Sequence, residues 1–301
     1  SLGVLPVSRS THFRVGVSVG GRWEELRDEA EPILADQMEL PDGAVAMSAS
    51  VDRISLPMAE ARELTPEDVE AGVANPISVN FRMAFTAVWT LYDKDGVPLT
   101  AVRYAHVPTD GALDMERCLA RDIDAVLRRR PTLQLVTLAD GAPEMQSILD
   151  RAVGTHPVVA RLVDFWHLIE HLGKANAAVR RFSQDLVHDW KADLLDRDEA
   201  IDQIEAQLHT WSLDYPDDAV PEGLYDALTY IDNHRERLRY ATVRAAGLPI
   251  GSGTVEATGK TVVEVRMKRA GARWAEPGAQ AIMGLRSLAT SDAKRWGAAI
   301  R

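Results

Sequence analysis

The alternation of apolar and polar positions predicts three strands in the first half of the chain. Residues 44–58 combine small and β-branched apolar residues, which is typical of a strand. Residues 80–93 and 97–107 flank Lys94-Asp95-Gly96, a strong hairpin signal. These three segments are therefore expected to form an antiparallel meander.

The middle of the chain alternates between helix and strand. Residues 111–130 have helical periodicity and lead into 132–140, a continuous apolar run that suits a buried strand. A second pair follows, with a helix at 143–153 and a strand at 157–165, before a helix at 166–182. The order predicts a mixed α/β layer of three antiparallel and two parallel strands flanked by helices.

The remaining segments are less regular. A helix is expected within residues 23–38 and a polar loop at 64–76. Residues 183–245 have an entirely helical pattern, with breaks near Pro216 and Pro221. This all-helical stretch is interpreted as an insertion into the α/β layer.

The glycine-rich stretch GSGTVEATGKT at residues 251–261 allows two interpretations. A phosphate-binding P-loop needs four residues between its glycines, but Gly253 and Gly259 are separated by five, and no buried strand precedes them. The alternative is a helix that begins at Ser252 or Thr254 and stops near Gly271. Glu256 then lies in its first turn, on one face with Gly259 and Lys260.

Two further acids stand out by position. Asp52 is expected near the end of the first strand, and Asp140 ends the strand after the first crossover helix. Ligands bind at the carboxyl ends of strands in open α/β sheets, although a lone Asp there is more often a turn or cap residue. Together with Glu256 they form a set of three carboxylates able to hold two Mg²⁺ ions.

Composition narrows the class of protein. The 301 residues are 46% hydrophobic, which is enough for a substantial core. The single cysteine, Cys118, excludes a disulfide framework and a cysteine-based zinc site, and it suits a reducing cytosol. No signal peptide and no apolar run of membrane-spanning length is present.

Charge is distributed unevenly along the chain. The net charge is −11, yet residues 235–301 hold 13 Lys and Arg against 5 Asp and Glu. This basic segment is a candidate surface for a polyanion, or else a solvated helix face. The basic residues that we expect to contact phosphates are Lys260, Arg266, Lys268, Arg269 and Arg273.

Several motifs together resemble a known family. They are VDRISLPM around Asp52, LADGAPEM around Asp140, DFWHLIEHL at 164–172 and GLPIGSGTVEATGKTVVEVRMKRAGARW around Glu256. The chain resembles the DDE transposases of bacterial insertion sequences, which have an RNase H-like catalytic core, and in particular the Kra-type group. One departure is Arg53, since a glycine commonly follows the first carboxylate.

The resemblance implies a fold, an activity and a site. It implies an RNase H-like core at 44–182 and 246–301, a helical insertion at 183–245 and a lead-in at 1–43. The activity would be metal-dependent cleavage and joining of DNA strands, with Asp52, Asp140 and Glu256 holding two Mg²⁺ ions, which Mn²⁺ can replace. The partners would be transposon ends, target DNA and further copies of the chain, with a cytoplasmic, nucleoid-associated location.

The stretch DFWHLIEHL carries alternatives. His167, Glu170 and His171 spell H-x-x-E-H, which a zinc metallopeptidase could use. The resemblance instead implies a D-x-x-H element, Asp164 to His167, near the active site and the DNA. Asp164 as a simple helix N-cap, ahead of core aromatic residues, is a third interpretation.

The tryptophans also divide into two groups. Trp89, Trp190 and Trp211 lie in apolar periodic stretches and are expected in the core. Trp274, among basic residues, could either pack or stack on a base.

Residues 1–43 contain no module for reading DNA ends, neither a zinc-ligand cluster nor a basic recognition helix. A separate recognition domain is therefore expected upstream of the first residue, Ser1. We expect these 301 residues alone to bind DNA weakly and with little sequence preference. A further alternative is a transposase-derived DNA-binding protein without cleavage activity.

Overall fold

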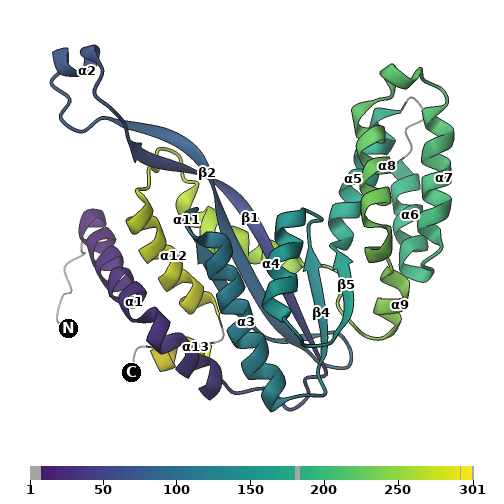
Figure 1. Ribbon diagram of the computed structural model, residues 1–301, viewed down its shortest axis with the longest axis horizontal. Helices are drawn as coiled ribbons and strands as arrows, with labels where there is room; N and C mark the ends of the chain where they lie inside the picture. The colour runs from purple at the N-terminus through teal and green to yellow at the C-terminus, as the bar shows by residue number, and fades with distance from the viewer. Residues whose placement is uncertain (1–7, 180–183, 292, 300–301) are drawn as a thin grey trace, which may run out of the picture.

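A five-stranded mixed sheet forms the centre of the computed structural model, which describes residues 8–179, 184–291 and 293–299. Its strand order is β3-β2-β1-β4-β5 (Figure 1). The pairs β1–β2 and β2–β3 are antiparallel, whereas β1–β4 and β4–β5 are parallel. The predicted α/β class and the mix of strand directions are therefore confirmed. The strands are β1 Ala46–Ala61, β2 Ile77–Tyr92, β3 Pro98–His106, β4 Gln134–Ala139 and β5 Val158–Val163.

The strands β1 and β2 extend well beyond the rest of the sheet. β1 pairs with β2 along all 16 residues but with β4 only from Ala46 to Ser50. The two strands therefore continue as a projecting ribbon (Figure 1). The loop expected at 64–76 contains a short helix at the ribbon's tip, α2 Pro66–Glu70, because Thr65 and Asp68 form a capping box.

Two helices cover one face of the sheet, and both were predicted. They are α3 Gly111–Arg129 and α4 Pro143–Val153. Met47, Ala49 and Val51 alternate along β1 and pack into the same core as these helices. Strand alternation thereby assigns the intervening residues of β1 to the opposite face.

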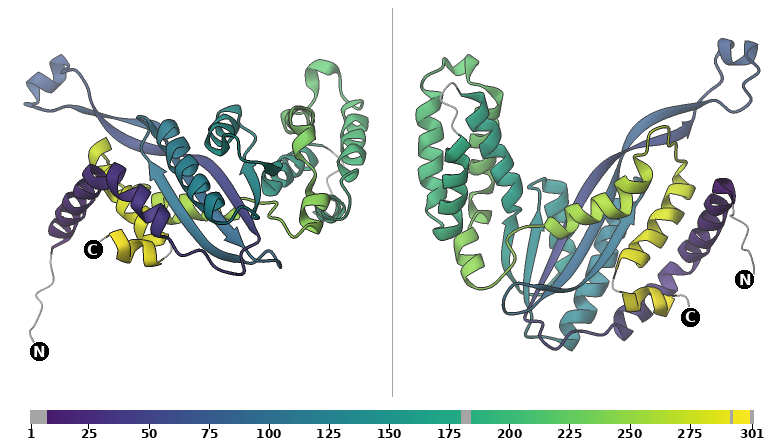
Figure 2. Two further views of the ribbon diagram at one scale, coloured as in Figure 1. Left: turned by 60° about the horizontal axis from the view of Figure 1, so that its bottom comes forward. Right: turned by 180° about the vertical axis from the view of Figure 1, so that it is seen from behind.

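The opposite face carries the C-terminal helices near the ribbon. Leu56 and Met58 of β1 pack with Val262, Met267 and Trp274. Beyond these helices α1 packs along α12, as Figure 2 shows from behind. The elements are α1 Arg9–Gln37, α10 Gly253–Thr258, the π-helical turn η3 Gly259–Glu264, α11 Val265–Met267, α12 Glu276–Thr290 and α13 Ala293–Ala299.

A helical bundle follows β5 and stands beside the sheet (Figures 1 and 2). Its core includes Trp190 and Trp211, which are buried as expected, as is Trp89 of β2. The helical pattern predicted for the insertion is confirmed over 184–245, and α5 packs into the same bundle through α8. The helices are α5 Phe165–Ala178, α6 Gln184–Asp196, α7 Ala200–Ser212, α8 Glu222–His234 and α9 Tyr240–Ala245, with 3₁₀ turns at Asp217–Ala219 and Arg235–Arg237.

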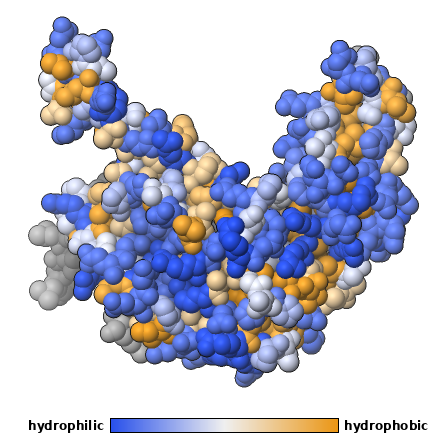
Figure 3. Space-filling model, in the orientation of Figure 1, coloured by the Kyte–Doolittle hydropathy of each residue, from blue (hydrophilic) through white to orange (hydrophobic). Residues whose placement is uncertain are grey.

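The ribbon and the bundle enclose a broad hollow. Figure 3 shows it as an open, mostly hydrophilic concavity between these two projections. Among the described residues, no helix has both the length and the apolar character that crossing a membrane requires.

A set of mostly buried charges joins α1, α3 and α13. It contains three arginines and three carboxylates, and we call it the balanced network. Each carboxylate has an arginine partner, for example Arg27 Nε to Glu31 Oε1 at 3.0 Å and Arg121 Nε to Asp122 Oδ1 at 2.9 Å. The members are Arg27, Glu31, Asp114, Arg121, Asp122 and Arg295.

Candidate metal and DNA site

Asp52 and Asp140 lie side by side at the point where β4 ends. In the parallel register Ser50 pairs with Leu138, and two further residues along each strand lead to Asp52 and Asp140. Leu138 packs into the core beneath the bundle, on the face opposite α3 and α4, and alternation puts both acids on that face. We had expected Asp52 near the end of its own strand, but it lies in the first half of β1. The relevant end is that of its partner β4.

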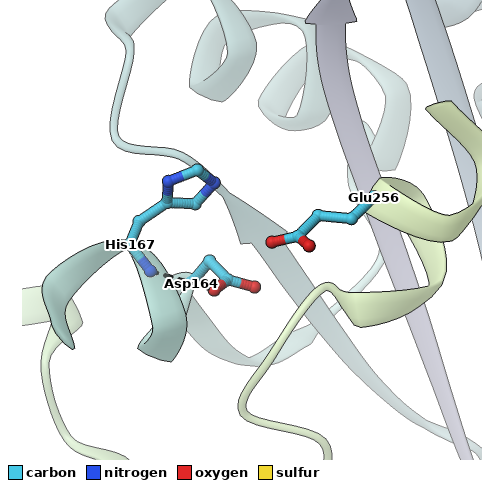
Figure 4. Close-up of side chains that lie close together, drawn as sticks. All are labelled: Asp164, His167 and Glu256. Atoms are coloured by element: carbon cyan, nitrogen blue, oxygen red, sulfur yellow. Dashed lines mark hydrogen bonds between the residues drawn. The ribbon is translucent and has the colours of Figure 1, made fainter. Parts of the chain in front are cut away.

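Glu256 reaches the same region from α10. Its carboxylate points toward Asp164 and His167 at the start of α5 (Figure 4). One ligand atom from each of these three residues lies within 4.8 Å of the other two. By distance alone, two carboxylate oxygens and an imidazole nitrogen could share one cation here.

The pKa of Asp52 depends on burial and on the charges of Asp140, His167 and Glu256. Burial raises this pKa above its ordinary value of 3.8, and the charges of Asp140 and Glu256 raise it further. The backbone N–H of Arg53, which donates to Asp52 Oδ1 at 2.6 Å, and the imidazole of His167 oppose the rise. Asp52 is therefore close enough to respond to the charges of all three of these side chains. The group of described residues whose ligand atoms lie within 4.8 Å of one another is nevertheless Asp164, His167 and Glu256, and it includes neither Asp52 nor Asp140. We call Asp52, Asp140 and Glu256 the carboxylate cluster.

The carboxylate cluster has little positive charge beside it. Within the described part of the chain, no lysine or arginine forms an ion pair with Asp52 or Asp140. Glu256 has only Lys260, whose Nζ lies 3.8 Å from Oε2 and whose side chain is 69% exposed. Arg53, next to Asp52, pairs with Glu144 of α4 at 2.7 Å. A cation from solution could supply the missing charge.

The turn that carries Asp140 is held by the helical bundle. Asp140 Oδ1 accepts a hydrogen bond from the N–H of Ala142 at 2.8 Å, and the Tyr230 hydroxyl donates to the Asp140 carbonyl at 2.8 Å. Gly141 has φ +95°, and a Cβ there would meet His234 Nε2 at 2.8 Å. Sequence reasoning missed Tyr230 and His234, because they lie some 90 residues away along the chain without a local motif.

The H-x-x-E-H stretch does not form a zinc site with both of its histidines. His167 faces Glu256, but His171 stacks on Tyr230 with ring centroids 4.0 Å apart. Burial lowers the pKa of His171, and Glu170 is exposed. Among the described residues, the group that could hold a metal combines His167 with Asp164 and Glu256, and it excludes Glu170 and His171.

The basic residues predicted to contact DNA lie on α10 to α11 and the loop that follows. Lys268 pairs with Glu264 at 2.7 Å, while Arg269 and Arg273 are exposed. Arg266 is half-buried, with its guanidinium 5.6 Å from the centre of the Trp274 ring.

The stacking role considered for Trp274 is not supported. Its side chain is only 7% exposed and packs against Phe13, with ring centroids 5.6 Å apart. Trp274 is a core residue here, and the ring is not available to a base.

The glycines around Glu256 mainly serve packing within the chain. A Cβ at Gly259 would collide with Ile54 of β1, and one at Gly251 would meet Trp166 Cδ1 at 3.3 Å. Only Gly253 has open space around it. Gly251 and Gly259 let α10 and its leading loop approach β1 and α5.

The predicted helix after Ser252 is present but irregular. Ser252 precedes α10 without capping it through its side chain. The π-helical turn η3 follows, and the helix ends at Met267, before Gly271 with φ +74°. π-Helical turns occur frequently at functional sites.

No protein-family model matches the chain, and no match was found among curated proteins or solved structures. Function is therefore inferred from the geometry of the site and from the motifs in the sequence.

Proposed function

We propose that this protein is the catalytic region of a metal-dependent DNA transposase that cleaves and joins DNA strands. The main support is that Asp52 and Asp140 lie side by side on one face of a mixed five-stranded sheet, with Glu256 near enough for its charge to raise the pKa of Asp52. Convergence of residues that are 88 and 116 positions apart is not expected of ordinary surface acids. The resemblance of the surrounding motifs gives the reaction class.

The residues of the carboxylate cluster suit hard divalent cations. They offer oxygen ligands, they lack strong basic partners, and the charge on Asp140 and Glu256 raises the pKa of Asp52. Two Mg²⁺ ions bound by such carboxylates stabilise both oxygens of an in-line phosphoryl displacement. The role of the three side chains is to hold the ions and leave ligand positions open for water and phosphate. His167 lies beside Glu256, and in this proposal it contacts the DNA next to the cleaved bond.

The surface around the site suits a long polyanion. The exposed residues Lys260, Lys268, Arg269 and Arg273 lie on the segment that also carries Glu256. The hollow between the ribbon and the bundle in Figure 3 is wide and hydrophilic. A DNA duplex bound along this segment would meet basic side chains at its phosphates, and these contacts would offset the repulsion from a chain of net charge −11.

The test is a cleavage assay on a duplex that carries the element's own ends. We expect nicked product with Mg²⁺ or Mn²⁺ and none with EDTA. Glu256→Gln is the matched control, because it keeps the size of the side chain and removes its charge. Binding without cleavage under all metal conditions would favour a DNA-binding protein, and Zn²⁺-dependent proteolysis would favour a peptidase.

A further inference from the structure

The carboxylate of Asp164 is buried and already fully hydrogen-bonded. The residue is 0% exposed, although it lies beside His167 and Glu256. Oδ1 accepts from the backbone N–H of Trp166 at 2.7 Å and of His167 at 3.3 Å. Oδ2 accepts from both the N–H and the hydroxyl of Ser252. A carboxylate has about four acceptor positions. The chain itself occupies them, so Asp164 has no free position for a metal ion.

These hydrogen bonds connect three elements of the site. The N–H of Asp164 donates to the carbonyl of Ala139 at 2.8 Å, directly before Asp140. The side chain begins α5, where His167 lies, and it fixes Ser252 ahead of α10. The carbonyl of Ser252 in turn accepts from the N–H of Glu256 at 3.3 Å.

A neighbouring contact strengthens the same connection. The N–H of Phe165 donates to the carbonyl of Ile250 at 3.2 Å. Gly251, between Ile250 and Ser252, lies so close that a Cβ there would approach Asp164 Oδ2 at 3.8 Å. The loop before α10 is thus held against the start of α5 on both sides of Gly251.

We propose that Asp164 is a positioning residue and not a metal ligand: it holds Glu256 and His167 in place relative to Asp140. This inference rests on the proposed function for its catalytic consequence, but the connection itself can be tested without it. Oδ1 of Asp164 caps the start of α5, and Oδ2 holds the segment that leads to Glu256.

The decisive variant is Asp164→Asn. The amide oxygen can still accept from Trp166 and His167, but the NH₂ group then faces the N–H of Ser252, donor against donor. We expect amide hydrogen exchange to become faster over residues 252–256 while the rest of α5 is unchanged. Cleavage should fall about 10- to 100-fold, as for other groups that orient metal ligands, through kcat and with KM for DNA unchanged. Ser252→Ala removes only the hydroxyl donor and should have a smaller effect of the same kind.

Asp198→Asn is the matched control. Asp198 makes the same type of connection inside the bundle, where it accepts from the N–H of Thr242 at 3.2 Å and from the Thr242 hydroxyl. We expect this variant to accelerate exchange around Thr242 and to leave cleavage unchanged. Loss of cleavage in both variants would mean that general destabilisation is the cause, and would overturn the positioning role.

Two further outcomes would overturn it. One is exchange and cleavage of Asp164→Asn equal to those of the unchanged protein. The other concerns metal binding. If Asp164→Asn binds one Mn²⁺ fewer by calorimetry while its amide exchange over residues 252–256 is unchanged, Asp164 is a metal ligand. If the unchanged protein shows no metal-dependent cleavage, the proposed function fails, while the exchange comparison still decides whether Asp164 holds Ser252.

Discussion

The balanced network and the carboxylate cluster are two groups of charged side chains with opposite arrangements. In the network, burial alone would raise the pKa of Asp122, but Arg295 and Arg121 hold that pKa below its ordinary value. In the cluster, burial raises the pKa of Asp52, and neighbouring carboxylates add to the rise. One group is neutralised within the chain and the other is not. The comparison distinguishes charges that are compensated within the fold from charges that a cation could compensate.

The largest expected contrast comes from the same substitution in each group. Asp122→Asn removes the carboxylate that Arg295 and Arg121 share and leaves Arg121 with Glu31 alone, so the free energy of unfolding should fall by about 3 to 5 kcal/mol. Asp140→Asn should abolish cleavage and leave stability unchanged or slightly higher, because it relieves repulsion with Asp52. Urea unfolding and the cleavage assay measure the two effects. The distinction fails if Asp140→Asn unfolds the protein.

A smaller effect concerns metal binding. Mg²⁺ at about 100 times its dissociation constant should raise the free energy of unfolding by about 2.7 kcal/mol. Asp52→Asn should remove most of this stabilisation by Mg²⁺. Asp114→Asn, in the balanced network, should lower the stability without metal but leave the stabilisation by Mg²⁺ unchanged. Thermal unfolding with Mg²⁺ and with EDTA at equal ionic strength gives the comparison. Equal gains in the unchanged protein and in Asp52→Asn would place the ion elsewhere.

The dependence on pH should have opposite signs in the two groups. The folded pKa of Asp52 lies above 3.8, so the native state binds this proton more tightly than the unfolded chain does. Its contribution to stability should rise as pH falls through the folded pKa toward 3.8. The folded pKa of Asp122 is lowered, so its contribution is present above 3.8 and is lost as pH falls below that value. Urea unfolding of Asp52→Asn without metal should lack the first trend, and an unchanged profile would contradict this assignment.

The smallest effect involves the exposed basic segment, a third arrangement of charge. Lys268 and Arg269 lie at the surface, and Lys268 forms an ion pair with Glu264. Replacing both with glutamine should reduce the slope of log affinity against log salt by about two units, roughly one for each lost phosphate contact. Fluorescence anisotropy with labelled duplex measures the slope. An unchanged slope would show that these residues are merely solvated.

Local sequence patterns predicted the helices and strands that periodicity and turn residues determine. The hairpin around Asp95, the helices α3 and α4, and the buried strand before Asp140 were all identifiable, because periodicity and turn residues determine them. The length of α1 was not predicted. Gly20 weakens a helix in isolation, but a Cβ there would collide with the backbone of Ala281, so its absence allows α12 to pack closely.

The candidate site residues could be proposed from the sequence, but the contacts that support them could not. Sequence motifs pointed to Asp52, Asp140 and Glu256. That Asp52 lies beside Asp140 depends on where β4 stops pairing with β1, which the sequence does not indicate. The Asp164 N-cap could be anticipated from sequence, but its hydrogen bonds to Ser252, 88 residues later, could not. Such contacts depend on the packing of the whole chain and leave no local pattern.

The π-helical turn between Glu256 and the basic residues has a consequence for tolerated changes in chain length. Its i→i+5 winding accommodates one residue more than an α-helical path, and Arg286 of α12 donates to the carbonyl of Val262 within it at 2.9 Å. Deleting one residue from Gly259–Glu264 would restore ordinary winding and leave both flanks facing as they do now. The same deletion in a regular helix rotates everything beyond it by about 100°. The turn is therefore a place where the gene can lose a codon while Glu256 and Lys268 keep their relative orientation.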